Sequence, residues 1–220
     1  MFQIKRDDFS IREFCLSDYK VLLKIADAIN QQAQTHSGYQ SFYAFQASKE
    51  QVDYNDFLQK HTKDFLLKAL NEKNTIPRKT HRMALCDGKN NLIGNITVDM
   101  IPSTDETGNL IYGDIGYFID PKHGRKGLMS KALTYVLGIY FQYYDTMDVT
   151  VHPNNLYSIK MLQRFNAKVV DFKKESIYNQ EPRMVLKIQK SDFEISQNPI
   201  YVTTQNPMKR KSERGRIKNV

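Results

Sequence analysis

Residues 113–129, GDIGYFIDPKHGRKGLM, constrain the fold of this chain more than any other stretch. Ile115, Tyr117 and Ile119 lie at alternate positions, and a period of two predicts a strand. Pro121 ends that strand, because proline has no backbone N–H to donate to a sheet. From Leu128 onward, apolar residues recur at helical spacing. The chain therefore passes from a strand through a tight turn into a helix.

The turn itself, residues 122–127, carries two glycines and three cations. The first N–H groups of a helix have no partner within the helix, and they carry partial positive charge. A turn of this composition at a helix N-terminus suits a phosphate or a pyrophosphate. The alternative is a solvated basic turn before an ordinary helix.

This stretch resembles the acyl-CoA-binding motif of the GCN5-related N-acetyltransferases, the GNAT superfamily. Within it, the stretch is most similar to the RimJ/RimL type, which acetylates the N-termini of ribosomal proteins. The chain departs from the motif where Gly124 precedes Arg125, since the family has the cation first and the glycine second. The residues that match are Ile115, Gly116, Tyr117, Asp120, Pro121, His123, Lys126, Gly127 and Met129.

A second block, residues 151–159 with the sequence VHPNNLYSI, resembles the family segment Pro-x-Asn-x-x-Ser-Ile. Asn155 and Ser158 are the matching residues. The two blocks occur in the order that the family shows, and a helix-length connection separates them. Together they make the less specific interpretation, a solvated basic turn, the weaker one. The resemblance extends from about Phe9 to about Ile188.

The resemblance implies an α+β fold with a mostly antiparallel central sheet of about six to seven strands and about four flanking helices. One parallel pair of strands is expected to splay apart, with a bulge at Gly116. The acetyltransferase domain is expected over residues 1–190, and a basic, largely flexible tail over residues 191–220. Part of that tail, from Phe193 to Val202, is expected to dock as a further strand or arm.

The residue pattern also places the individual elements. A hairpin turn is expected at Asp87-Gly88, a helix N-cap at Ser17 or Asp18, and a left-handed residue at Asn166. Ser48 and Gln51 form a candidate capping box for one long helix. Residues 31–47 show no clean period. Strands are expected at 9–14, 81–86, 92–100, 110–119, 147–151, 168–172 and 183–188, and helices at 48–70, 128–144 and 155–166.

The resemblance assigns cofactor contacts to both blocks. In the first block, the pyrophosphate of acetyl-CoA would lie on the turn and the helix start, and the strand would offer its backbone to the pantetheine arm. In the second block, Asn155 would bond the arm, although its residue type also suits a helix N-cap. The expected cofactor-binding residues are Phe118, Ile119, Gly124, Arg125, Lys126, Gly127, Leu128, Met129, Asn155 and Ser158.

The catalytic acid and base are less well specified. Leu162 occupies the position where many members of the superfamily have a tyrosine acid, and Tyr157 lies one turn early. Asp114 is a candidate base acting through water, or alternatively a polar residue on an exposed strand face. Tyr117 is the second catalytic candidate, because a backbone N–H in this strand is placed to stabilise an oxyanion.

Composition limits the setting. No apolar run approaches the roughly 20 residues of a membrane helix, and the N-terminus lacks a signal-peptide core. Cys15, Cys86 and the five histidines show no metal-ligand spacing. A cytoplasmic protein without metal or membrane is expected, as a monomer or a homodimer. Of the net charge of +8, +5 falls on residues 207–220, so RNA or the ribosome is a candidate partner for the tail.

These observations predict an acetyl-CoA-dependent N-acetyltransferase that acts on a primary amine by direct attack in a ternary complex. A protein N-terminus is favoured as acceptor, because its pKa near ~8 makes it easier to deprotonate than a lysine near ~10.4. Two alternatives stay open. One is an acetyltransferase of small amines such as polyamines or aminoglycosides. The other is a non-catalytic CoA-binding module that binds RNA or the ribosome.

Overall fold

The computed structural model describes residues 3–33, 35, 42–74, 80–99, 103–104, 110–112, 115–173 and 182–197. In this part of the chain, ten strands form two five-stranded sheets. The first sheet, in the order β1-β2-β3-β4-β7, is antiparallel throughout. Its strands are β1 (Gln3–Lys5), β2 (Phe9–Glu13), β3 (Thr80–Asp87), β4 (Leu92–Asp99) and β7 (Ile115–Ile119).

The second sheet has the order β5-β6-β8-β10-β9, and its one parallel ladder joins β6 to β8. Its strands are β5 (Ser103–Thr104), β6 (Leu110–Tyr112), β8 (Thr146–Val151), β9 (Lys168–Lys173) and β10 (Arg183–Gln189). The predicted α+β class is confirmed. The strands of the single expected sheet are divided between two sheets, and the short strands β1 and β5 add to their number. Where one strand was predicted over residues 110–119, the described residues form two, β6 and β7.

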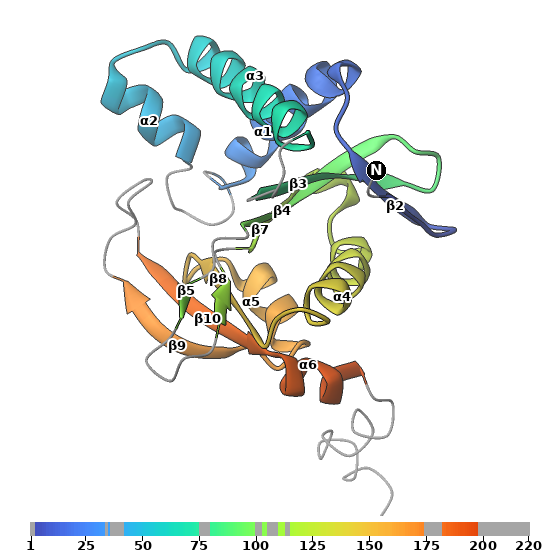
Figure 1. Cartoon of the computed structure of the whole chain (residues 1–220). Coiled ribbons are helices and arrows are strands. Elements are labelled where there is room, and N and C mark those ends of the chain that lie inside the picture. The colour runs from blue at the N-terminus through green and yellow to red at the C-terminus, as the bar shows by residue number, and fades with distance from the viewer. Residues whose placement is uncertain are drawn as a thin grey trace, which may run out of the picture.

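The two sheets separate between β7 and β8, which lie next to each other in the middle of the molecule (Figure 1). β6 pairs with the start of β8, whereas β7 pairs with β4. The expected splayed pair is therefore present. The bulge predicted at Gly116 is not, because Gly116 pairs in regular register with Thr97. The change of partner falls between Tyr112 and Ile115.

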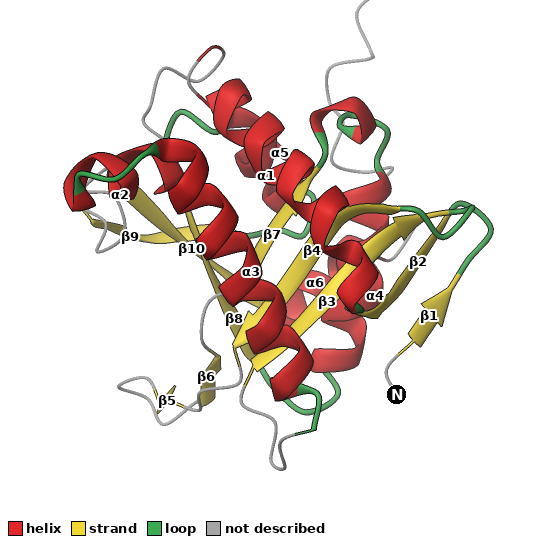
Figure 2. Cartoon of the chain, turned by 90° about the horizontal axis from the view of Figure 1, so that it is seen from above, coloured by secondary structure: helices red, strands yellow, loops and turns green. Residues whose placement is uncertain are grey.

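Helices cover both faces of the first sheet (Figures 1 and 2). On one face, α1 (Tyr19–Gln32) and α3 (Tyr54–Glu72) pack through leucine, isoleucine and phenylalanine side chains onto β3 and β4. On the other face, α4 (Leu128–Tyr140) buries one stripe against the larger core, which β8 and β10 complete. The helical spacing that predicted α4 thus reflects a buried face on that helix. The buried residues of α4 are Met129, Ala132, Leu133, Val136, Leu137 and Tyr140.

The long helix predicted over residues 48–70 is wrong, because two helices occupy this region. α2 (Phe42–Glu50) ends before Gln51, whose φ of 55° breaks the helix. Asp53 then caps α3 and accepts hydrogen bonds from the backbone N–H groups of Asn55 and Asp56. Ser48 therefore lies inside α2 and is not an N-cap. α2 also includes residues 42–47, which belong to the stretch that showed no clean period.

Other predictions at the ends of elements are confirmed. Asn155 is the N-cap of α5 (Leu156–Gln163), and Asn166 adopts the left-handed conformation with φ 56°. The hairpin turn between β3 and β4 includes Asp87-Gly88. Two short 3₁₀ helices, η1 (Leu16–Asp18) and η3 (Pro121–His123), precede α1 and α4.

Residues 190–197 form a helix, α6 (Lys190–Gln197), where the expected strand or arm was to begin. Residues 198–202 of that expectation lie outside the described residues. Its Phe193 is buried and contacts the rings of Phe141 and Phe165, with ring centroids 5.2 and 6.1 Å away. The core therefore continues as far as α6. The remaining residues of the tail lie outside the described part of the chain.

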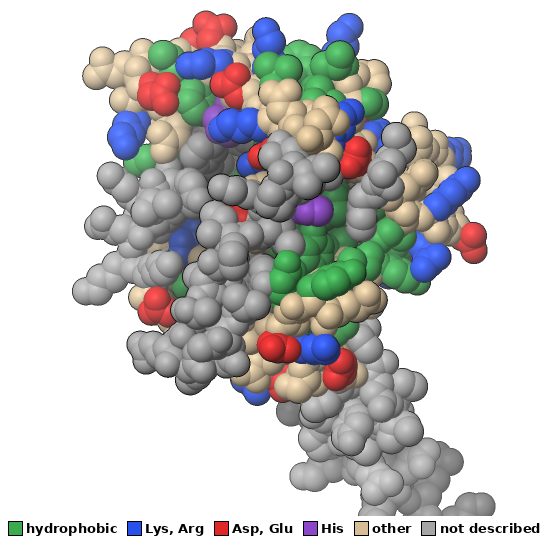
Figure 3. Space-filling view, in the orientation of Figure 1, with side chains coloured by type: hydrophobic (Ala, Val, Ile, Leu, Met, Phe, Trp, Pro, Cys, Tyr) green, Lys and Arg blue, Asp and Glu red, His purple; other side chains and the backbone are tan. Residues whose placement is uncertain are grey.

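Charged side chains of both signs are interspersed on the face that Figure 3 shows, while hydrophobic side chains gather over α4. The described residues on this face form no large patch of one sign. None of the helices in the described part of the chain combines the length and apolar character of a membrane span. In the same part, no three histidine, cysteine, aspartate or glutamate side chains come together as a metal site would require.

Candidate active site

The turn between β7 and α4 is held by its own hydrogen bonds. The Asp120 carboxylate accepts a hydrogen bond of 2.9 Å from the backbone N–H of Lys122, and Gly124 N–H donates to the Pro121 carbonyl at 3.1 Å. Asp-Pro starts this turn for a physical reason: the aspartate caps it, and proline fixes φ at the first turn position. The loop thus leaves the sheet in a defined direction toward α4.

Gly127 is the N-cap of α4, and its φ of 76° is a left-handed conformation that favours glycine. No side chain caps this helix, whereas Asp53 caps α3 and Asn155 caps α5. A Cβ added at Gly127 would meet nothing within 4 Å. The N-terminus of α4 therefore opens onto free space, with N–H groups and a partial positive charge directed at an incoming anion.

The order Gly124-Arg125 affects the turn at one residue. Gly124 has φ −62° and ψ 161°, an extended conformation that any residue adopts. Arg125 has φ 61°, so a left-handed conformation falls on the arginine, at the position where the resembled motif has glycine. This conformation costs a non-glycine residue about 1 kcal/mol. The swap therefore moves the cation by one position, to an exposed residue of the turn, and adds some backbone strain.

The ladder between β4 and β7 determines which backbone groups of β7 are left for a ligand. Asp120 N–H donates to the Ile93 carbonyl at 2.7 Å, and hydrogen-bonded pairs alternate along an antiparallel ladder. The peptide groups of Phe118 therefore also face β4. Those of Tyr117 and Ile119 face the opposite way, toward β8, where the two sheets separate. This gap is where an extended ligand could bond like an additional strand.

The N-terminus of α5 closes the other side of the gap. The Asn155 side chain accepts a hydrogen bond from Ser158 N–H at 3.2 Å, as an N-cap does. His152 supports the same turn, because its Nδ1 accepts from Asn154 N–H at 3.0 Å and its carbonyl accepts from Asn155 N–H at 2.8 Å. The Ser158 hydroxyl lies 2.5 Å from the hydroxyl of Tyr117. Residues from both sequence blocks therefore meet in one place.

Comparison with known proteins agrees with this arrangement. Residues 9–168 match a family model described as "Acetyltransferase (GNAT) domain". The chain belongs to the GNAT acetyltransferase family. A search of curated proteins found no match for this GNAT chain.

Solved structures share the fold of this GNAT chain at low sequence identity. RimJ of Mycobacterium smegmatis, solved in complex with CoA-disulfide, has a TM-score of 0.60 at 12% identity, covering 84% of this chain and 83% of its own. A ribosomal-protein-S5-alanine acetyltransferase of Vibrio fischeri has a TM-score of 0.56 at 15% identity, covering 88% and 99%. A chimera of the Vibrio cholerae spermidine N-acetyltransferase has a TM-score of 0.56 at 14% identity, covering 84% and 97%.

The other residues that were considered for catalysis add no catalytic group to the described part of this GNAT protein's site. Asp114 lies outside the described residues. Leu162 is 1% exposed and packs in the core, so its position offers no polar group. Tyr157 is 63% exposed at the start of α5, and the Arg125 guanidinium lies 5.8 Å from its ring centroid. Cys86 is buried, and burial raises the pKa of its thiol to about 11, which makes it a poor nucleophile.

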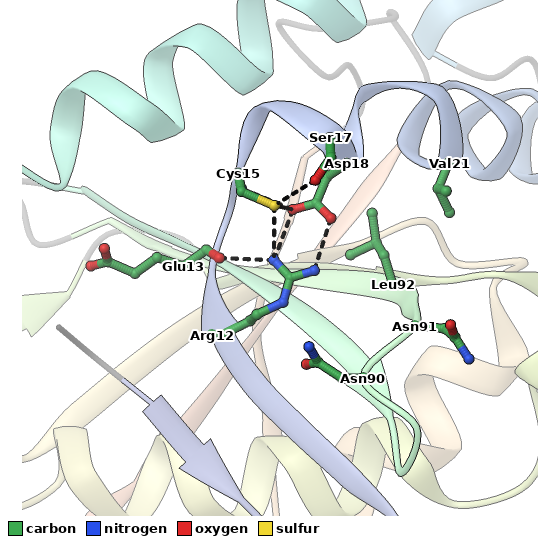
Figure 4. Close-up of a pocket in the computed structure, with 9 residues that line it drawn as sticks. All are labelled: Arg12, Glu13, Cys15, Ser17, Asp18, Val21, Asn90, Asn91 and Leu92. Carbon is green, nitrogen blue, oxygen red and sulfur yellow. Dashed lines mark hydrogen bonds and ion pairs between the residues drawn. The ribbon is translucent and has the colours of Figure 1, made fainter.

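A separate hollow of about 520 Å³ lies where β2 leads into α1 (Figure 4). Arg12 binds the nearly buried Asp18 carboxylate through two hydrogen bonds of 2.8 Å, and Cys15 N–H donates to the same carboxylate at 2.9 Å. These groups satisfy one another and fasten β2 to α1. The hollow shares no residue with the turn before α4 or with α5, so we assign it a structural role. The pairing with Arg12 had no signal in the sequence, because Asp18 there suggested only a helix cap.

Proposed function

We propose that this protein is an acetyl-CoA-dependent N-acetyltransferase that transfers an acetyl group to a primary amine. The observation that carries the proposal is the uncapped N-terminus of α4 beside the gap between β7 and β8. A pyrophosphate fits the first feature, and an extended arm with amide groups fits the second. Coenzyme A has both. The GNAT structures solved with CoA or acetyl-CoA support the same ligand.

Each part of the site binds a different part of coenzyme A. The N–H groups of residues 126–129 hold the pyrophosphate, and Arg125 and Lys126 add positive charge. The backbone of Tyr117 and Ile119 bonds the pantetheine arm from one side of the gap. Asn155 does so from the other side, while it also caps α5. The peptide groups of Phe118 face β4, so Phe118 lies in the strand beside the arm without bonding the arm through its backbone.

The chemistry requires a proton for the departing thiolate and the loss of a proton from the amine. The hydroxyl pair of Tyr117 and Ser158 lies at the gap, where Ser158 shares the first turn of α5 with Asn155. This pair is our candidate proton donor to the thiolate. The backbone N–H of Tyr117, which faces the gap, is the candidate oxyanion donor. Asp114 is the candidate base and acts through water.

For the acceptor, we favour a protein N-terminus, because its amine loses a proton more readily than a lysine does. The shared fold does not separate this acceptor from a small amine, since the ribosomal-protein and spermidine acetyltransferase structures are about equally similar to this chain. Attack is direct, because neither cysteine belongs to the residues that line the gap and the pKa of Cys86 is raised.

The test is steady-state turnover of acetyl-CoA with N-terminal peptides, polyamines and aminoglycosides as separate acceptors. Acetylated peptides, without an acetylated enzyme, support the proposal. A preference for a polyamine or an aminoglycoside would change the proposed acceptor but not the proposed enzyme class. Tight CoA binding without turnover of any amine would favour the non-catalytic module. Gly127→Glu should abolish CoA binding, because a carboxylate would then stand in front of the α4 N-terminus.

A further inference from the structure

Arg125 is an exposed residue at which the site departs from its family motif. Its φ of 61° is an uncommon conformation for a non-glycine residue, and glycine would adopt it without strain. Strain of this kind persists where the surroundings over-determine it, and it is frequent at ligand-binding loops. The presence of arginine at a position that favours glycine therefore suggests that Arg125 does more than supply charge.

The Arg125 side chain extends over an aromatic ring. Its guanidinium carbon is 5.8 Å from the ring centroid of Tyr157, within cation–π distance. Among the described residues, no carboxylate lies within salt-bridge distance of Arg125. Tyr157 is 63% exposed, and its neighbour Leu156 is 59% exposed. A guanidinium plane and a phenol ring thus stand together at the surface with much of their area open to solvent.

This pair joins the two parts of the proposed cofactor site. Arg125 precedes the α4 N-cap by two residues, and Tyr157 follows the α5 N-cap by two residues. The pair therefore lies beside the proposed position of the pyrophosphate. The portion of coenzyme A that continues beyond the pyrophosphate is the phosphorylated adenosine, which carries a planar base.

We propose that Arg125 and Tyr157 form a stacking platform for the adenine of coenzyme A. Aromatic rings and guanidinium planes both stack on nucleobases, because each presents a flat surface with delocalised electrons. The platform would make the two residues determinants of cofactor specificity, distinguishing the full nucleotide from its phosphopantetheine portion. This inference rests on the proposed use of acetyl-CoA.

The experiment compares dissociation constants of two ligands by titration calorimetry: CoA, and 4′-phosphopantetheine, which lacks the 3′-phospho-AMP half of CoA and therefore the adenine and two of the three phosphates. Tyr157→Ala should weaken CoA binding by roughly 5- to 100-fold, the range for loss of one stacked base, and leave phosphopantetheine binding unchanged. Tyr157→Phe should bind CoA like the wild type. Tyr143→Ala is the matched control, because Tyr143 is also highly exposed, at 70%, but lies beyond the opposite end of α4.

Arg125→Gly supplies a second variant that is not at risk of unfolding, since glycine adopts φ 61° without strain. Its melting temperature should equal or exceed that of the wild type. Its charge loss weakens both ligands, but CoA binding should fall by a further factor of at least about 3. CoA carries two more phosphates than phosphopantetheine, so loss of charge alone also changes the ratio of the two dissociation constants. Arg125→Lys keeps the charge but lacks the planar guanidinium, and the ratio for CoA over phosphopantetheine should rise in this variant as well.

The outcomes separate the inference from the proposed function. An unchanged ratio in both Tyr157→Ala and Arg125→Lys would overturn the platform and leave the acetyltransferase proposal intact. Equal weakening of both ligands by Tyr157→Ala would also overturn it, because the tyrosine would then only support the shape of the site. Failure of the wild type to bind either ligand would overturn the proposed function, and the platform with it.

Discussion

At the scale of single residues, the contact between Tyr117 and Ser158 makes a prediction about catalysis. Tyr117→Phe and Ser158→Ala should each lower turnover by about 100-fold, at the lower end of the range for acid catalysis. Because the two hydroxyls are hydrogen-bonded to each other, the double variant should be little slower than either single one. The KM for acetyl-CoA should change little. If the two reductions in turnover instead multiply in the double variant, the hydroxyls act independently.

Two glycines of α4 allow a matched test of backbone strain. A Cβ at Gly127 or at Gly138 would meet nothing within 4 Å, but Gly127 has φ 76° and Gly138 lies inside the helix. Gly127→Ala should therefore lower the free energy of unfolding by about 1 kcal/mol. Gly138→Ala should raise it by up to about 1 kcal/mol, because alanine favours the helix. Urea unfolding measures both, and equal effects would contradict the role of φ at Gly127.

The same scale shows which site residues the sequence could reveal. The positions of Gly127, Asn155 and Ser158 at helix N-termini were predictable, because their residue types match what a helix N-terminus requires. The contact of Arg125 with Tyr157 was not, since they are 32 positions apart in the sequence and only the fold brings the turn before α4 next to α5. The orientation of the Tyr117 and Phe118 peptide groups also depends on the register with β4, which no pattern in β7 alone specifies.

At the scale of elements, the junction of β2 and α1 makes a prediction about acid stability. Burial alone would raise the pKa of Asp18, but hydrogen bonds from Arg12 and Cys15 outweigh burial and hold the pKa below its ordinary 3.8. A carboxyl with a lowered pKa contributes stability that is fully present above the ordinary value and is lost as the pH falls through the folded value. The pair should therefore stabilise the fold at pH 7 and lose its effect below pH 3.8.

Asp18→Asn tests this junction. At pH 7 the variant should lose about 3 kcal/mol of unfolding free energy, because Arg12 keeps a charge without its partner. The difference from the wild type should shrink as the pH falls below 3.8, which denaturant unfolding at several pH values measures. Asp8→Asn is the control, because the Asp8–Lys131 pair is exposed and its loss should be undetectable. A difference that stays constant with pH would contradict the assignment.

Elements with a strong periodic pattern were predictable, and their junctions were less so. Short apolar segments located β2, β3, β4 and β10, and β2, β3 and β4 have consecutive buried residues because helices cover both faces of their sheet. The 3.6-residue stripe located α4, because that helix has one buried face. The break between α2 and α3 was missed, because residues 48–58 contain neither glycine nor proline. Its cause is Gln51 in the left-handed conformation, followed by Asp53 as a cap. An aspartate in a polar stretch was the only available signal.

At the scale of the whole molecule, the division into two sheets could not be read from the strands themselves. β6 and β7 follow one another in the sequence, and their apolar pattern predicted one strand over residues 110–119. The structure gives them different partners, β8 and β4. Strand periodicity reports which face is buried, but the partner of an edge depends on contacts distant in sequence. The gap that forms the candidate site is therefore a property of the topology.

At the same scale, α6 contributes to the core of the described part of the chain. Phe193 of α6 is buried against Phe141 and Phe165, so a chain ending at Gln189 should lose about 3–5 kcal/mol or fail to fold. A chain ending at Gln197 keeps α6 and should retain both the melting temperature and the turnover of a small amine.

The chain ending at Gln197 also lacks all six cations of residues 207–220. If these cations bind RNA, the shortened chain should bind RNA more weakly, with a smaller slope of log affinity against log salt. Equal binding by the full chain and the chain ending at Gln197, measured at several salt concentrations, would exclude the tail as an RNA contact. The loss of turnover in the chain ending at Gln197 would instead make the tail part of the acetyltransferase.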